Sequence, residues 1–169
     1  MPFKIILPVS LVLFAACANA QTTVQKAFGV GLELGAPSNS IYTIGFGGSG
    51  KAEMPLSSSI SLTFTAGYTS FYYKNTLIGS ASKQTPGGFI PLKAGLKYFF
   101  SQGVYVEAEG GDVIETNYDK HNLFTYAVGP GFVIPAGKNA GIDLGFRYES
   151  WGRNRLKQTG IRAAYRFGW

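Results

Sequence analysis

The sequence predicts an all-β protein, an eight-stranded antiparallel transmembrane up-and-down β-barrel. Three observations indicate this fold class. Apolar residues alternate with small or polar residues through eight segments, which is the period of a β-strand with two different faces. Tight turns alternate with longer polar loops between those segments. Charged residues make up only 14% of the chain, against about 25% in ordinary soluble domains.

The first 20 residues have the layout of a secretory signal peptide. Lys4 supplies a positive charge, an apolar run follows, and residues 18–20 (Ala-Asn-Ala) form a small-x-small cleavage site. The apolar run is shorter than the roughly 20 residues that a membrane-spanning helix needs. We therefore expect residues 1–20 to be a signal peptide and residues 21–169 to form one barrel domain.

The single cysteine, Cys17, falls inside the expected signal peptide. The mature chain would then contain no thiol and no disulfide. Residues 14–17 loosely resemble a bacterial lipoprotein box, with Phe where Leu is usual, so lipidation of Cys17 stays open.

The first four predicted strands show the alternation in turn. In residues 28–35, Phe, Val and Leu alternate with Gly and Glu, and residues 42–47 alternate aromatic or aliphatic residues with Thr and Gly. Residues 60–72 set apolar residues against Ser and Thr, and residues 90–100 set them mainly against Lys and Gly.

The last four predicted strands continue the pattern. Residues 104–109 and 124–134 alternate apolar residues with Glu and with small residues, respectively. Residues 141–149 and 160–169 place Gly, Asp, Glu and Arg between Ile, Leu, Phe and Tyr. The total is an even number of strands, as in bacterial barrels.

The predicted connections differ in length between the two ends. Tight turns are expected at residues 55–58, 101–103 and 136–139. Longer polar loops are expected at residues 74–87, 111–121 and 150–156, with a short first connection at 37–40. Short turns at one end and longer loops at the other are typical of outer-membrane barrels.

The two strand faces decide which side meets lipid. One face carries aromatic and aliphatic side chains, and the other carries Gly, Ala, Ser, Thr and a few charges. The second face would be a poor water-exposed surface, but it suits the lining of a narrow barrel. We therefore expect the apolar face to contact lipid, with Tyr and Trp toward the strand ends. A soluble barrel with its aromatic face inside is the alternative fold.

Residues 43–53 read TIGFGGSGKAE, and their glycine spacing matches both a dinucleotide-binding fingerprint and most of a P-loop. A P-loop needs Ser or Thr where this chain has Ala52, and both motifs need a helix that Pro55 would break. We therefore assign the segment to the second strand, with Phe46 facing lipid and the glycines leaving room inside. No cofactor is expected.

Ten charged residues share the inward face of the predicted strands. They are Glu33, Lys93, Lys97, Glu107, Glu109, Asp143, Arg147, Glu149, Arg162 and Arg166. Lys97 falls opposite Glu107 across a tight turn, and the two arginines of the last strand lie near the strands of Asp143 and Glu33. Because buried charges are costly unless paired, we expect a structural ion-pair network that fills the lumen. A proton or ion path along these charges is the alternative interpretation.

The sequence does not indicate an enzyme. Its one histidine, His121, stands in a predicted loop without a serine at a neighbouring position, and Asp112, Glu115 and Asp119 read as solubilising loop acids. A metal site is not indicated, because one histidine and no mature cysteine give no ligand spacing. The net charge of +6 is too diffuse to indicate nucleic-acid binding.

The last eight residues, RAAYRFGW, form an amphipathic segment that ends in an aromatic residue. Their pattern resembles the C-terminal assembly signal of outer-membrane barrels, with Ala164 where Gly is usual. The matching residues are Arg162, Ala164, Tyr165, Phe167 and Trp169. Such a signal implies recognition by the barrel-assembly machinery during insertion.

Residues 21–169 as a whole resemble the small eight-stranded OmpA/OmpX-type outer-membrane β-barrel family, and the strand at 89–100 is especially similar. The resemblance implies a Gram-negative outer membrane, with outer-membrane lipid and lipopolysaccharide as partners. It also implies a non-enzymatic structural or surface-interaction role through the extracellular loops. A porin-like channel or transporter for small solutes is the alternative function.

Overall fold

The computed structural model describes residues 24–38, 40–74, 85–117, 122–152 and 156–169. The expected signal peptide, Cys17, His121 and parts of the predicted loops lie outside the described residues. Among the described residues, no helix is long and apolar enough to cross a membrane.

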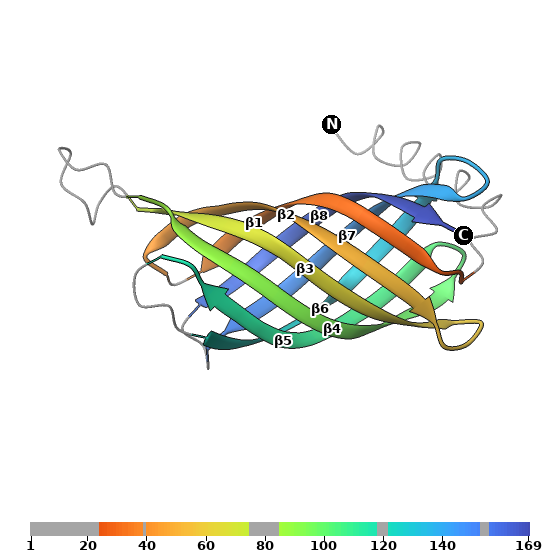
Figure 1. Ribbon diagram of the computed structural model, residues 1–169, viewed down its shortest axis with the longest axis horizontal. Coiled ribbons are helices and arrows are strands. Elements are labelled where there is room, and N and C mark those ends of the chain that lie inside the picture. Colours follow the sequence, from red (N-terminus) through yellow and green to blue (C-terminus); the bar gives the residue numbers. More distant parts are fainter. Residues whose placement is uncertain (1–23, 39, 75–84, 118–121, 153–155) are drawn as a thin grey trace, which may run out of the picture.

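Eight antiparallel strands form one closed barrel, which confirms the predicted fold class (Figure 1). Each strand pairs with its neighbour in sequence, and the last pairs with the first. The strands are β1 (Ala27–Ser38), β2 (Tyr42–Pro55), β3 (Ile60–Tyr73), β4 (Gly87–Ser101), β5 (Val104–Glu115), β6 (Asn122–Pro135), β7 (Ala140–Trp151) and β8 (Leu156–Gly168).

The predicted boundary of the fifth strand was wrong. We expected a loop from residue 111, but β5 continues to Glu115, because Gly111 pairs with Lys93 of β4 and Val113 pairs with Leu123 of β6. Gly110, Gly111 and Asp112 are successive residues without an apolar side chain, so the alternation of apolar and polar residues cannot be recognised there. Several other predicted loops are likewise shorter, as β2 extends through Pro55 and the seventh strand through Trp151.

The two ends of the barrel differ. The turns at 56–59, 102–103 and 136–139 lie at the end that also holds residues 24–26 and Trp169, which we call the termini end. The second of these is very tight, and Gly103 there has a φ of 76°, which glycine adopts without steric cost. The other ends of the strands, including Tyr73 of β3, Gly87 of β4 and Glu115 of β5, lie at the opposite end of the barrel, which we call the loop end (Figure 1).

The outer face of the barrel is apolar around its circumference. Large hydrophobic side chains on all eight strands remain exposed, among them Leu32 at 61% and Phe124 at 62%. The charged side chains of the same strands are buried on the inner face, as Glu33 and Arg162 show. This arrangement is the reverse of a water-soluble barrel, and it fits a barrel surrounded by hydrocarbon.

Leu32→Arg should destabilise the folded barrel by about 2–4 kcal/mol, because it places a charge near the bilayer midplane. Leu32 lies near the middle of β1 and points outward, so an arginine would meet lipid rather than protein. Tyr72→Arg, one residue before the end of β3, should cost at most about 1 kcal/mol.

The measurement is equilibrium unfolding in urea from short-chain phosphatidylcholine vesicles. Equal losses for the two variants would contradict the lipid-facing assignment. A wild-type chain that stays folded and soluble without detergent or lipid would support the soluble barrel instead.

Candidate functional site: the charged interior of the barrel

Small inward residues make room for large side chains inside the barrel. Tyr105 of β5 lies across Gly131 of β6 toward Gly145 of β7, and a Cβ at Gly131 would overlap the tyrosine ring. A Cβ at Gly45 of β2 would in the same way overlap the ring of Phe71. Glycines on the inner face therefore accommodate side chains that cross the lumen.

Twelve charged side chains project into the interior, six acidic and six basic. Ten of them are the residues that the sequence analysis placed on the inward face. The other two, Lys51 and Glu53 of β2, are 4% and 3% exposed and were not predicted. Sequence reasoning ended the alternation of this strand at Gly47, because the next outward positions hold Gly48 and Gly50 instead of large apolar residues.

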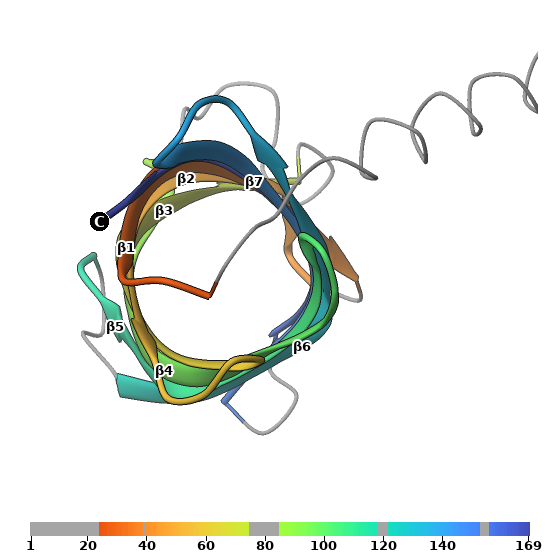
Figure 2. The ribbon, with the colours of Figure 1, turned by 90° about the vertical axis from the view of Figure 1, so that its right-hand side faces the viewer.

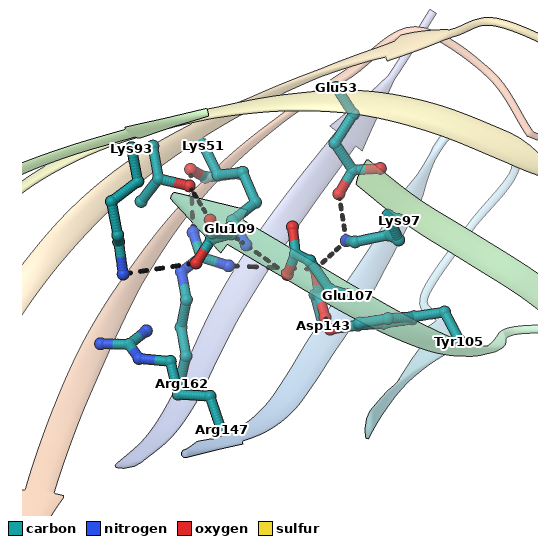
Figure 3. Close-up of polar contacts among 12 residues, drawn as sticks. Lys51, Glu53, Lys93, Lys97, Tyr105, Glu107, Glu109, Asp143, Arg147 and Arg162 are labelled. Atoms are coloured by element: carbon teal, nitrogen blue, oxygen red, sulfur yellow. Dashed lines mark hydrogen bonds and ion pairs between the residues drawn. The ribbon is translucent and has the colours of Figure 1, made fainter. Parts of the chain in front are cut away.

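The twelve side chains form one unbranched chain of ion pairs in which acids and bases strictly alternate. Figure 3 shows a part of this chain, with Lys51 between Glu107 and Glu109 and with Lys97 beside Glu53 and Asp143. In order, its members are Glu107, Lys51, Glu109, Lys93, Glu149, Arg147, Glu33, Arg162, Asp143, Lys97, Glu53 and Arg166. Every member except the first and last contacts two partners of opposite charge. Because the chain contains six acids and six bases, it is neutral as a whole.

Lys97 is the most enclosed cation of this chain, with a side chain that is fully buried. Its Nζ lies 2.6 Å from Glu53 Oε1 and 3.0 Å from Asp143 Oδ2. The same Nζ is 4.2 Å from the centre of the Tyr105 ring, and the Tyr105 hydroxyl donates a hydrogen bond to Asp143. Both carboxylates and the aromatic face compensate the loss of water around the ammonium group.

The pairing of Lys97 with Glu107 that the turn suggested does not occur. The two residues are register partners on β4 and β5, but the Lys97 ammonium reaches Glu53 on β2 and Asp143 on β7 instead. Glu107 contacts Lys51, with 2.6 Å between Oε2 and Nζ. Lys97 and Lys51 therefore pair with residues on strands other than those of their register partners, whereas Arg162 does contact its register partner Glu33.

Arg147 of β7 and Arg162 of β8 both contact Glu33 of β1, next to the pairing of β1 with β8 that closes the barrel. Arg147 contacts Glu33 at 2.6 Å and Glu149 at 3.0 Å. Arg162 lies 3.7 Å from Glu33 and 3.9 Å from Asp143, the two strands expected for it. Arg166 pairs with Glu53 of β2 at 3.0 Å instead.

An apolar cluster fills the lumen at the loop end. Its buried members are Phe71, Phe89, Val113, Trp151 and Leu156. The Trp151 ring lies 5.4 Å from Phe71 and 5.3 Å from Phe89 between ring centroids. Tyr42, which we expected on the lipid-facing side with Ile44, packs against this cluster, because an irregularity in the β2–β3 pairing lies between those two residues. The cluster covers the ion-pair chain on that side.

A second apolar cluster lies at the termini end. Phe99, Tyr105 and Val133 are buried there, and Val24 packs against them. Figure 2 shows the N-terminal segment, in red, turning inward across this opening of the barrel. The Gln25 carbonyl accepts a hydrogen bond from Arg166, so the segment also meets the last member of the ion-pair chain. Side chains thus occupy the interior at both ends and between them, apart from a cavity of about 20 Å³ beside Lys51, Glu107 and Glu109.

The residues of the expected assembly signal occupy both faces of the last strand. Arg162 and Ala164 are buried inside, whereas Tyr165, Phe167 and Trp169 are outward and 44%, 49% and 68% exposed. The Tyr165 and Phe167 rings are 4.7 Å apart, which extends the aromatic surface at the termini end. Recognition by an assembly machinery stays a prediction.

The acids that the sequence analysis placed in a loop can be compared with the structure only in part, because Asp119 lies outside the described residues. Asp112 and Glu115 belong to β5 rather than to a loop, which corrects their expected position. Within the same described ranges, no cluster of three or more His, Cys, Asp or Glu side chains could hold a metal ion.

No protein-family profile matches this sequence, and no curated protein matches it. Solved structures do match its fold. The crystal structure of Neisserial surface protein A has a TM-score of 0.60 at 15% identity, covering 85% of this chain and 97% of that one. The crystal structure of Ail, the attachment invasion locus protein of Yersinia pestis, has a TM-score of 0.55 at 13% identity, covering 86% and 100%.

A de novo designed transmembrane β-barrel is similar as well, with a TM-score of 0.51 at 17% identity over 87% of this chain and 98% of that one. Natural and designed barrels therefore share the fold of this chain. At these identities the similarity shows the fold alone.

Double-mutant cycles should separate the observed ion pairs from the pairing that strand register suggests. Lys97→Met alone should cost about 3–5 kcal/mol, because it leaves two buried carboxylates short of a partner. Combined with Glu53→Gln, it should show a coupling of about 1–3 kcal/mol. Combined with Glu107→Gln, it should show a clearly smaller coupling, and Lys51→Met should couple to Glu107→Gln instead.

The measurement is again urea unfolding from lipid vesicles. A coupling of Lys97 to Glu107 as large as its coupling to Glu53 would contradict the ion-pair chain described above.

Proposed function

We propose that the protein is an integral outer-membrane β-barrel of a Gram-negative bacterium. Its role is structural or surface-interacting, exerted through the connections at the loop end, and its lumen is closed by ion pairs. The filled interior is the observation that carries this proposal. An ion-pair chain between two apolar clusters leaves no wide path for a solute, so contacts with partners fall to the surface.

The distribution of charge supports lipopolysaccharide as a partner. The chain carries a formal net charge of +6, and the twelve interior charges cancel. Without Lys4 of the expected signal peptide the excess is +5, and it lies outside the lumen. Lys26 and Lys138 belong to the termini end, whereas positive charges in the connections at the loop end would meet the anionic phosphate groups of lipopolysaccharide. Similarity to proteins named for the cell surface and for attachment, at the level of fold, is compatible with this role.

Purified protein in planar bilayers should show no stable single-channel conductance. Apolar clusters occupy the lumen at both ends, and the ion-pair chain lies between them, so we expect no continuous water-filled path. A general porin in the same bilayers serves as the positive control. Discrete, reproducible conductance steps from the folded barrel would favour the alternative function, a small-solute channel.

The loop end should face the outside of the cell. A Ser80→Cys variant, changed between β3 and β4, should be labelled by a membrane-impermeant maleimide on intact cells. A Ser58→Cys variant, changed in the turn between β2 and β3, should stay unlabelled on intact cells. Cells with a permeabilised outer membrane should label at both positions. Labelling of Ser58→Cys alone on intact cells would reverse the orientation and remove the proposed role of the loop end.

A further inference from the structure

A small cavity lies in the charged interior, beside the first member of the ion-pair chain. Its volume is about 20 Å³, which exceeds the roughly 10–15 Å³ that one water molecule needs. Inward glycines form part of its wall, and charged side chains from four strands border it, among them Lys51, Glu107, Arg147 and Arg162. The cavity therefore offers polar partners to one small molecule.

Glu107 differs from the other interior acids in how its carboxylate is used. In the part of the chain that the structure describes, its Oε2 pairs with Lys51, but its Oε1 is buried without a hydrogen-bond partner. Each of the other five acids uses both carboxylate oxygens in hydrogen bonds or ion pairs. A carboxylate oxygen that is buried without a donor costs free energy, so this oxygen needs a donor from outside the chain.

Arg162, which borders the same cavity, has one guanidinium nitrogen without a close acceptor. Its Nε donates to Ser49 Oγ at 3.0 Å, and its Nη2 lies 3.4 Å from the carbonyl oxygen of Gly29. The third nitrogen, Nη1, is 3.9 Å from Asp143 Oδ2, which is too far for a hydrogen bond. An acceptor in the cavity would complete the hydrogen bonding of this group.

We infer that the cavity binds one water molecule, which donates a hydrogen bond to Glu107 Oε1 and accepts one from Arg162 Nη1. Water is suited to the site because it donates and accepts at once. A chloride ion could not donate to Glu107, and a sodium ion would be repelled by the lysine and the two arginines that border the cavity. The bound water connects the first member of the ion-pair chain to its middle. This site does not depend on the proposed surface role.

The test measures nuclear Overhauser effects between water and amide protons, on isotope-labelled wild-type protein folded into phosphatidylcholine nanodiscs. Amide protons beside the cavity, such as those of Gly129 and Gly145, should show cross-peaks at the water frequency. These cross-peaks should have opposite signs in laboratory-frame and rotating-frame spectra, because a bound water molecule stays far longer than a bulk one. Their absence from the folded wild type would overturn the inference.

Gly145→Ala should remove these cross-peaks, because its methyl group would occupy the cavity. The added Cβ would meet only the Tyr105 hydroxyl oxygen, at 3.2 Å, so the barrel can accept it with a small shift of that group. Gly110→Ala is the matched control, since it adds the same methyl group on the outer face, where the nearest atom is the Thr125 carbonyl oxygen at 3.9 Å. The control should keep the cross-peaks. Cross-peaks that persist in folded Gly145→Ala would contradict the assignment to this cavity.

Glu107→Met should also remove the cross-peaks, because it deletes the carboxylate without adding volume to the cavity. If they persisted, Glu107 would not be the group that holds the water. Replacing sodium chloride with choline gluconate should leave the wild-type cross-peaks and the Gly145 amide resonance unchanged, and a shift of that resonance would identify an ion in place of water. Heat-modifiable gel mobility confirms the fold of each variant, and either variant alone tests the site if the other does not fold.

Discussion

The alternating ion-pair chain is the constraint on which the rest of the interior depends. Six acids and six bases lie inside a barrel whose two openings hold apolar clusters, so each charge needs a partner of opposite sign. Because every inner member has two partners, removing one leaves two neighbours short of compensation. The members come from six strands, and pairs such as Lys51–Glu107 and Lys97–Asp143 join strands that are not neighbours in the barrel. The chain therefore favours one arrangement of the closed barrel over alternatives in strand register.

The strands without charged inward residues supply the space that this chain needs. At the level of the charges, β3 offers Ser61, Thr63 and Thr65 to the interior, and β6 offers Ala127 and small neighbours. Side chains from other strands lie against them, as Lys97 does beside its register partner Ser61. A larger residue at these positions would compete with a charged side chain for the same volume, and the displaced charge would lose its partner.

Alternation in the sequence was sufficient to predict the fold, because an inward and an outward face impose a period of two on every strand. It was insufficient where glycine occupies outward positions. Gly48 and Gly50 stand at outward positions of β2 where apolar side chains were expected. The alternation could therefore not be followed to Lys51 and Glu53, and these two inward charges were not predicted. The ion pairs inside the lumen could also not be predicted from the sequence. Whether the Lys97 ammonium group can contact Glu53 and Asp143 depends on the curvature of the closed barrel.

The same glycines connect the interior to the lipid-facing surface. Inward glycines such as Gly131 make room for side chains of the protein, whereas the outward Gly110 has open space before it. Within the described residues, the neutral interior leaves a cavity of only about 20 Å³ beside Lys51, Glu107 and Glu109, which is room for a water molecule and not for a larger ligand. Specific binding therefore has to use the two surfaces that remain, the positively charged ends and the apolar wall.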